Sequence, residues 1–122
     1  MKNFKTVMFA TVFASTVLAA PFASAHAKLT KSDPKAGTTL QVAPKEVALT
    51  FNEKIEQSFS SMSVIDTEGK AITQVKAKVD VANPAVLRLP LAQVHSGAYT
   101  VKWAVAGHDG HRRTGDFKFS VK

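Results

Sequence analysis

Apolar and polar residues alternate in short runs along the chain after residue 26, and no sustained helical period appears there. The clearest runs carry apolar residues at every second position: Val47, Leu49 and Phe51; Tyr99, Val101, Trp103 and Val105; and Phe117, Phe119 and Val121. Side chains of a strand point alternately to its two faces, so each run predicts a strand with one buried face. Tyr99 and Trp103 are accordingly expected in the core.

Turn residues separate these runs at short intervals. Segments 62–66 (MSVID) and 71–79 (AITQVKAKV) flank a predicted hairpin turn over 67–70, and 85–89 (AVLRL) follows Asn83-Pro84. Such spacing is typical of an antiparallel β-sandwich or barrel, here with about seven strands. No linker, repeat or low-complexity tract interrupts the pattern, so we expect one small domain over residues 26–122.

The first 25 residues have a different pattern, which is that of a secretory signal peptide. Lys2 and Lys5 precede an apolar stretch that is short for a membrane span, and Ala23-Ser24-Ala25 supplies the small residues of a cleavage site. Cleavage after Ala25 would make His26 the first residue of the exported chain. An uncleaved membrane anchor is the lesser alternative, so no integral membrane segment is expected after cleavage.

Composition narrows the chemistry further. The chain contains no cysteine, which excludes disulfides, blue-copper sites and zinc–thiolate sites. The formal net charge is +7, and removal of Lys2 and Lys5 leaves about +5. The basic residues are scattered along the predicted strands and are not interleaved with aromatic residues, so no nucleic-acid partner is expected. Such a surface would suit, loosely, an acidic or membrane-adjacent partner.

A Gly-rich segment between the last two predicted strands contains the most reactive residues. It reads VAGHDGHRRTGDF over 105–117 and carries His108, Asp109 and His111. Imidazole suits copper, zinc, nickel and iron, and an extended backbone would point Asp109 and His111 the same way. Gly107 and Gly110 would let the loop turn sharply around a site. Without further support, solvent-exposed loop residues would be an equally good interpretation.

His26 strengthens the metal interpretation. At the start of an exported chain it offers both an α-amine and an imidazole, which can chelate one ion together. An imidazole nitrogen from His111 would complete a T-shaped set of three nitrogens, a histidine brace. This tetragonal coordination favours Cu(II). Asp109 would then either supply an oxygen ligand or orient an imidazole.

Two long segments resemble the CopC family of exported copper-binding proteins. The first, over 26–56, is HAKLTKSDPKAGTTLQVAPKEVALTFNEKIE, and the second, over 96–121, is SGAYTVKWAVAGHDGHRRTGDFKFSV. The resemblance implies a cupredoxin-like or immunoglobulin-like β-barrel, a periplasmic location, and one Cu(II) held by His26, His111 and Asp109. It also implies an acidic residue at Glu53 near the site.

Two departures from the family pattern matter. Some members bind Cu(I) through a Met-rich segment, whereas Met62 is the only methionine after residue 26, so no such second site is expected here. His108 stands where the family often has a small or polar residue. Its side chain would ligate copper, tune it as a neighbour, or point to solvent, and alternation along a strand slightly favours solvent. His95 is expected to be a surface loop residue.

These observations favour a copper carrier or buffer in copper homeostasis or resistance, with a membrane copper transporter as a partner that the resemblance suggests. A copper-dependent oxidative enzyme using the same brace is an alternative. The small chain and an acidic ligand in coordination space that oxygen needs both argue against it, so no enzymatic activity is expected. A metal-free structural sandwich domain is the other alternative, because fold alone does not exclude it.

Overall fold

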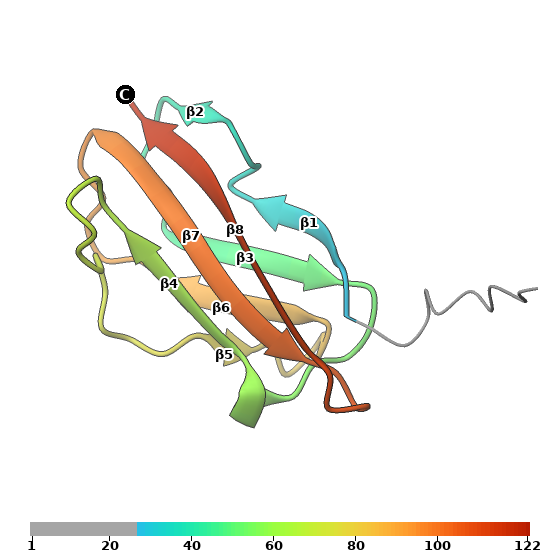
Figure 1. The fold of residues 1–122 in the computed structure, drawn as a ribbon. Helices are drawn as coiled ribbons and strands as arrows, with labels where there is room; N and C mark the ends of the chain where they lie inside the picture. Colours follow the sequence, from blue (N-terminus) through green and yellow to red (C-terminus); the bar gives the residue numbers. More distant parts are fainter. Residues whose placement is uncertain (1–26) are drawn as a thin grey trace, which may run out of the picture.

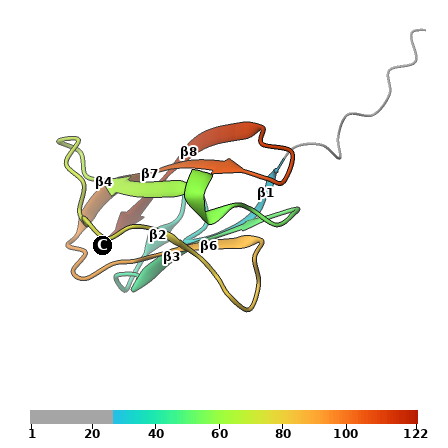
Figure 2. The same ribbon diagram turned by 90° about the horizontal axis from the view of Figure 1, so that it is seen from below.

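The computed structural model describes residues 27–122, which form two four-stranded β-sheets packed face to face (Figures 1 and 2). One sheet has the order β1-β3-β6-β5 and the other the order β2-β8-β7-β4. The strands are β1 (Leu29–Asp33), β2 (Thr39–Leu40), β3 (Glu46–Phe51), β4 (Ser61–Ile65), β5 (Lys78–Val79), β6 (Val86–Pro90), β7 (Gly97–Ala106) and β8 (Arg112–Val121). The all-β sandwich expected from the alternating pattern is confirmed.

The burial of β3 follows its sequence pattern closely. Val47, Leu49 and Phe51 are buried while Glu46, Ala48 and Thr50 are not fully covered. This strand lies between β1 and β6, and both pairings are antiparallel. A one-residue slip would turn the apolar face outward, so burial of that face fixes the register.

The longest pairing in the molecule is the β7–β8 hairpin. Its antiparallel register runs from Gly97 opposite Val121 to Ala106 opposite Arg112. The loop over 107–111 therefore projects from one end of the sandwich, at the tip of two ten-residue strands. This position makes the loop accessible while its two ends are held by the sheet.

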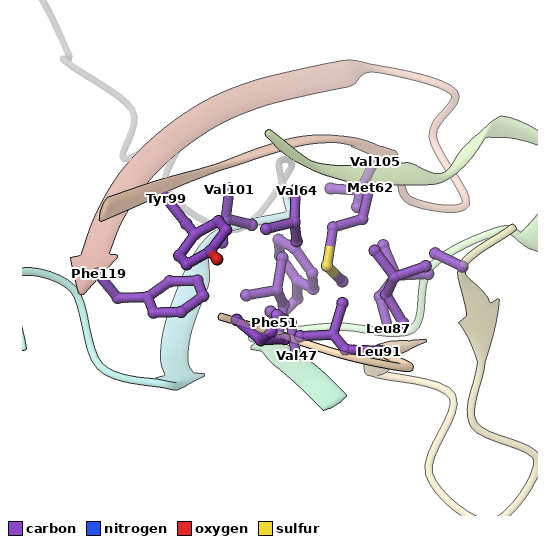
Figure 3. Packing of buried hydrophobic residues seen from close by; sticks show 14 of the residues in the cluster. Val47, Phe51, Met62, Val64, Leu87, Leu91, Tyr99, Val101, Val105 and Phe119 are labelled. Carbon is purple, nitrogen blue, oxygen red and sulfur yellow. The ribbon is translucent and has the colours of Figure 1, made fainter. Parts of the chain in front are cut away.

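Apolar side chains from both sheets fill the space between them (Figure 3). Tyr99 and Phe119 stack with ring centroids 5.4 Å apart, and Phe51 meets Trp103 edge to face at 5.2 Å. Tyr99 is buried as expected, whereas Trp103 lies half-buried at the margin of the core. The indole lies over Gly115, where any Cβ would collide with it.

The structure also departs from the sequence prediction in detail. The turn at 67–70 is present, but segment 71–79 is not one strand. Ala71 forms an isolated bridge with Ile65, and only Lys78–Val79 pairs again, with β6. The two-residue strand β2 was not predicted and pairs in parallel with β8. Eight named strands thus replace the seven expected.

Helical structure is minor in the described part of the chain. The 3₁₀ helix η2 spans Gln57–Phe59. Within residues 27–122, no helix is long and apolar enough to cross a membrane.

Candidate metal centre

The loop between β7 and β8 is closed by its own backbone. The Gly110 amide donates to the carbonyl oxygen of Gly107 at 3.0 Å, and Gly110 has a φ of +75°. Residues with a Cβ rarely adopt that conformation, so glycine suits this position. The turn leaves Asp109 and His111 next to one another on the exposed side of the loop.

Asp109 and His111 are joined by two contacts. One carboxylate oxygen, Oδ1, accepts the backbone amide of His111 at 3.0 Å, and Oδ2 lies 3.0 Å from its Nδ1. An ionised carboxylate only accepts hydrogen bonds, so its pairing with a neutral His111 selects the tautomer with the proton on Nδ1. The lone pair of the neutral imidazole is then on Nε2. This is the arrangement in which a carboxylate fixes the tautomer of a metal-binding histidine.

The segment over 52–56 lies against the base of this loop. The Glu56 amide donates to the Ala106 carbonyl oxygen at 2.9 Å, and Ile55 forms a β-bridge with Gly107. The Glu53 carboxylate occupies the space that a Cβ on Gly107 would need. Glycine at 107 therefore allows the acidic side chain to approach the backbone of the loop, two residues before Asp109.

His108 faces a different neighbour from His111. Its Nδ1 lies 3.1 Å from Oε1 of Glu56, and the imidazole is 76% exposed. This contact ties the loop to Glu56, the residue that precedes η2. An exposed contact of this kind contributes little stability by itself.

The beginning of the described chain is fixed by Asn52. The Lys28 amide donates to the side-chain oxygen of Asn52 at 2.7 Å, and the Asn52 amide returns a bond to the Lys28 carbonyl at 2.9 Å. Ala27 is fully buried in the core. In both views the start of β1 and the β7–β8 loop lie at the same end of the sandwich (Figures 1 and 2).

Of the predicted ligands, Asp109 and His111 come together, and Glu53 lies against the same loop. His26 lies outside the described residues. Within residues 27–122, no group of three His, Cys, Asp or Glu side chains is arranged to hold a metal ion. The imidazole and carboxylate of the pair are nevertheless donors that suit Cu(II).

Comparison with known proteins identifies the fold and the family. The family model described as the CopC domain matches residues 29–122. This chain belongs to the CopC family. The crystal structure of CopC from Methylosinus trichosporium OB3b superposes with a TM-score of 0.74 at 34% identity, covering 80% of this chain and 94% of that one.

Two curated relatives match over nearly their full lengths. Protein YobA of Escherichia coli K12 is 34% identical over 97% of this chain and 96% of its own. Copper resistance protein C of Pseudomonas syringae pv. tomato is 32% identical over 93% and 94%. CopC proteins are periplasmic copper-binding carriers and not enzymes, so the copper-carrier class expected from the sequence is confirmed.

The remaining histidine is placed as predicted. His95 is exposed in the loop before β7, and its carbonyl oxygen accepts the Tyr99 hydroxyl at 2.7 Å. Its structural contribution is therefore through the backbone.

The sequence prediction missed Asn52 and Glu56. Asn52 directly follows a strand with a clear apolar face, and Glu56 ends the same short run, FNEKIE. That position is the one signal that would have singled them out.

Proposed function

We propose that this CopC protein holds one Cu(II) through a histidine brace and carries or buffers copper in the periplasm. The brace consists of the amine and imidazole of His26 with the imidazole of His111, and Asp109 accompanies them. The observation that carries the proposal is the Asp109–His111 pair, which leaves Nε2 of His111 as the basic nitrogen. A bound Cu(II) would supply a centre that prefers such nitrogen donors.

The anchored start of the chain supports the involvement of His26. Ala27 is buried and Lys28 is bonded to Asn52, and Asn52 is followed by the Glu53 that contacts the loop backbone at Gly107. The start of β1 is thereby held at the end of the sandwich that carries the β7–β8 loop. In the sequence, His26 directly precedes this anchored segment.

Export of the protein would create the amine ligand. Cleavage of residues 1–25 by signal peptidase would free the α-amine of His26, so the amine becomes a ligand only after the protein has left the cytoplasm. His108 is left outside the brace that we propose, because its recorded contact is with Glu56 and not with the Asp109–His111 pair. Glu53 positions the loop through Gly107. A membrane copper transporter is the partner that we propose for the carrier.

Cu(I) is not expected to have a site of its own. Met62 is the one methionine after residue 26, and its side chain is buried in the core of the sandwich. A thioether cluster for the softer ion therefore has no donors to build it.

The test is a Cu(II) competition titration followed by EPR on two exported preparations. One begins at His26, with its start confirmed by intact mass, and the other has a single Gly before His26. We expect the first to bind one Cu(II) and the second to bind it at least about 100-fold more weakly, because the extension removes the chelating amine. Equal affinities would refute the brace.

The same Cu(II) titration is then made on two substituted proteins. His111→Ala should weaken Cu(II) binding by more than about 100-fold, since a nitrogen ligand is lost. His95→Ala is the matched control and should leave the affinity unchanged, because His95 lies exposed before β7. An unchanged affinity in His111→Ala would move the site elsewhere.

A further inference from the structure

An exposed aromatic side chain stands beside the candidate copper loop. Phe59, the last residue of η2, is 66% exposed, whereas the other described phenylalanines are in or packed against the core. None of the residues of η2 is buried, although the Gln57 amide bonds to the backbone of Ala77 and Val79. Exposed Phe side chains are enriched in protein interfaces, where they supply much of the binding energy.

Two neighbouring hollows lie along η2, and one of them reaches the loop. One, of about 320 Å³, is lined by Phe59, Ala106, Gly110 and Arg112, so its wall includes both neighbours of His111. The other, of about 490 Å³, shares three serines with the first and is bordered by Val75 and Lys76, but Phe59 does not line it. Val75 is itself 54% exposed. We call the surface formed by Phe59, Val75, Lys76 and Arg112 the η2 face.

The charges of the η2 face are positive and unopposed. Within residues 27–122, neither Arg112 nor Lys76 forms an ion pair. Glu56, the acidic residue next to η2, is engaged by His108. A ligand on this surface would therefore gain from carboxylates around an apolar centre, and Arg is well suited to bind a carboxylate in two places.

We propose that the η2 face docks a copper-handling protein whose own surface presents carboxylates around an apolar centre, and that docking brings this partner against the loop carrying His111. The proposal rests on the proposed copper-carrier function. Phe59 enters the partner's apolar centre, while Arg112 and Lys76 meet its carboxylates. A hollow lined by an exposed aromatic side chain, with a second hollow next to it, fits protruding side chains of a protein better than a flat lipid surface.

The geometry links docking to copper movement. Gly110 and Arg112 line the hollow and directly flank His111 in the chain. A partner seated there covers the exposed side of the loop, so its own ligands come within reach of the ion that His111 would hold. Electrostatic attraction to Arg112 would also speed the encounter and make it sensitive to salt.

The experiment is site-specific photo-crosslinking of the full-length protein in its native host. A photoreactive phenylalanine analogue replaces Phe59 in one strain and Val42 in another. Val42 is 78% exposed and follows β2, at the other end of the sandwich from the loop. We expect a crosslink at position 59 well above that at position 42, to a copper-handling protein identified by mass spectrometry, within a peptide that contains Asp or Glu.

Charge reversal then tests the docking chemistry. Arg112→Glu should lower the crosslink at position 59 about tenfold, and Lys substitutions of the carboxylates in the crosslinked peptide should restore it. Lys118→Glu, on the exposed side of the same strand, is the matched control and should change the yield less than about twofold. No excess crosslink at position 59, or one indifferent to Arg112→Glu, would overturn the proposal, as would a crosslink to lipid or to a second copy of this chain.

Copper titration separates this proposal from the proposed function. Phe59 and Arg112 are not ligands, so Phe59→Ser and Arg112→Glu should each retain one Cu(II) with the affinity of the unsubstituted protein. If the unsubstituted protein binds no Cu(II), the carrier proposal fails, whatever the crosslinking shows. If the variants bind Cu(II) normally while the crosslink is absent or indifferent to charge, only the docking proposal fails.

Discussion

Two turns of this protein are built with the same local chemistry and differ in what surrounds them. At 66–70, Asp66 Oδ1 accepts the amides of Glu68 and Lys70, and Gly69 has a φ of +80°. At 107–111, Asp109 Oδ1 accepts the amide of His111, and Gly110 has a φ of +75°. Both are Asx-type turns in which an aspartate and a glycine set the backbone.

The two turns differ in what the second carboxylate oxygen of the aspartate contacts. In the 107–111 loop, Oδ2 of Asp109 holds the imidazole of His111, and the segment over 52–56 lies against the loop base. The 66–70 turn has no histidine. An ordinary turn thus becomes a candidate metal centre through one imidazole and through neighbours distant in sequence.

The largest effect is expected from acidification, which should remove the Cu(II) affinity that distinguishes the 107–111 loop from the 66–70 turn. Cu(II) and protons compete for the same nitrogens, and the ordinary pKa of His is about 6.5, so lowering the pH below this value protonates the ligands. We expect Cu(II) affinity to fall by at least about 100-fold between pH 7.5 and pH 5.5, because imidazole and amine protons are both involved. Competition titrations at four pH values measure this. A flat profile would rule out nitrogen ligation.

Removing the carboxylate from each turn should separate copper binding from turn stability. Asp109→Asn should weaken Cu(II) binding about 10- to 100-fold, since the imidazole of His111 loses its orienting acceptor. Asp66→Asn is the matched control and should leave the affinity unchanged. Its cost should be limited to about 1 kcal/mol of unfolding free energy from weaker amide bonds. Similar copper affinities in the two variants would contradict the role given to Asp109.

Alanine at one glycine of each region should give a smaller contrast. Gly107→Ala places a methyl group in the position of the Glu53 carboxylate, so either the end of the Glu53 side chain or the loop must shift. The part of the movement that the loop takes up should lower Cu(II) affinity by up to about tenfold. Gly69→Ala meets no atom but keeps a positive φ, so it should cost about 1 kcal/mol of stability without changing copper affinity. Titration and urea unfolding distinguish the two effects.

A second substitution identifies the cause of the Gly107→Ala effect. Glu53→Ala in the Gly107→Ala background removes the side chain that the new methyl group meets. The double variant should therefore recover part of the lost affinity. A double variant as weak as Gly107→Ala, with Glu53→Ala alone unaffected, would show that the clash is not the cause.

The smallest effect is expected at a carboxylate remote from both turns. Arg88 donates to Asp80 Oδ2 at 2.9 Å, and this bond holds the pKa of the Asp80 carboxyl below its ordinary value of 3.8. Its stabilising contribution is therefore present above that ordinary value and is lost as the pH falls through the lowered one. Asp80→Asn should lower the Tm at pH 7 by less than Gly69→Ala does. The difference from the unsubstituted protein should shrink below pH 4, and thermal scans at pH 7 and pH 3 test this.

The strands with a full alternating pattern were predictable from sequence. Val47, Leu49 and Phe51 in β3 are buried as their spacing indicates, because a period of two can bury only one face. The stretch 71–79 was predicted wrongly. It has β-forming residues, yet Val75 is exposed and only its last two residues join β6. Tertiary context overrode the local propensity there.

The residues of the candidate site also fall into a group that was predictable from sequence and a group that was not. Asp109 and His111 could be paired from sequence because they are two residues apart and the contact is local. Asn52 and Glu56 could not, because their partners Lys28 and His108 are far along the chain and meet them through sheet packing. The parallel pair of β2 with β8 escaped prediction for the same reason.

The placement of Trp103 has a spectroscopic consequence. It is the single tryptophan of the chain, and its indole lies between the ring of Phe51 and the bare backbone of Gly115. Phe51 directly precedes Asn52, the residue that anchors Lys28. Intrinsic fluorescence therefore comes from one defined location at the margin of the core, next to the segment that meets the copper loop. Changes in this fluorescence can therefore be assigned to one position without attaching a dye.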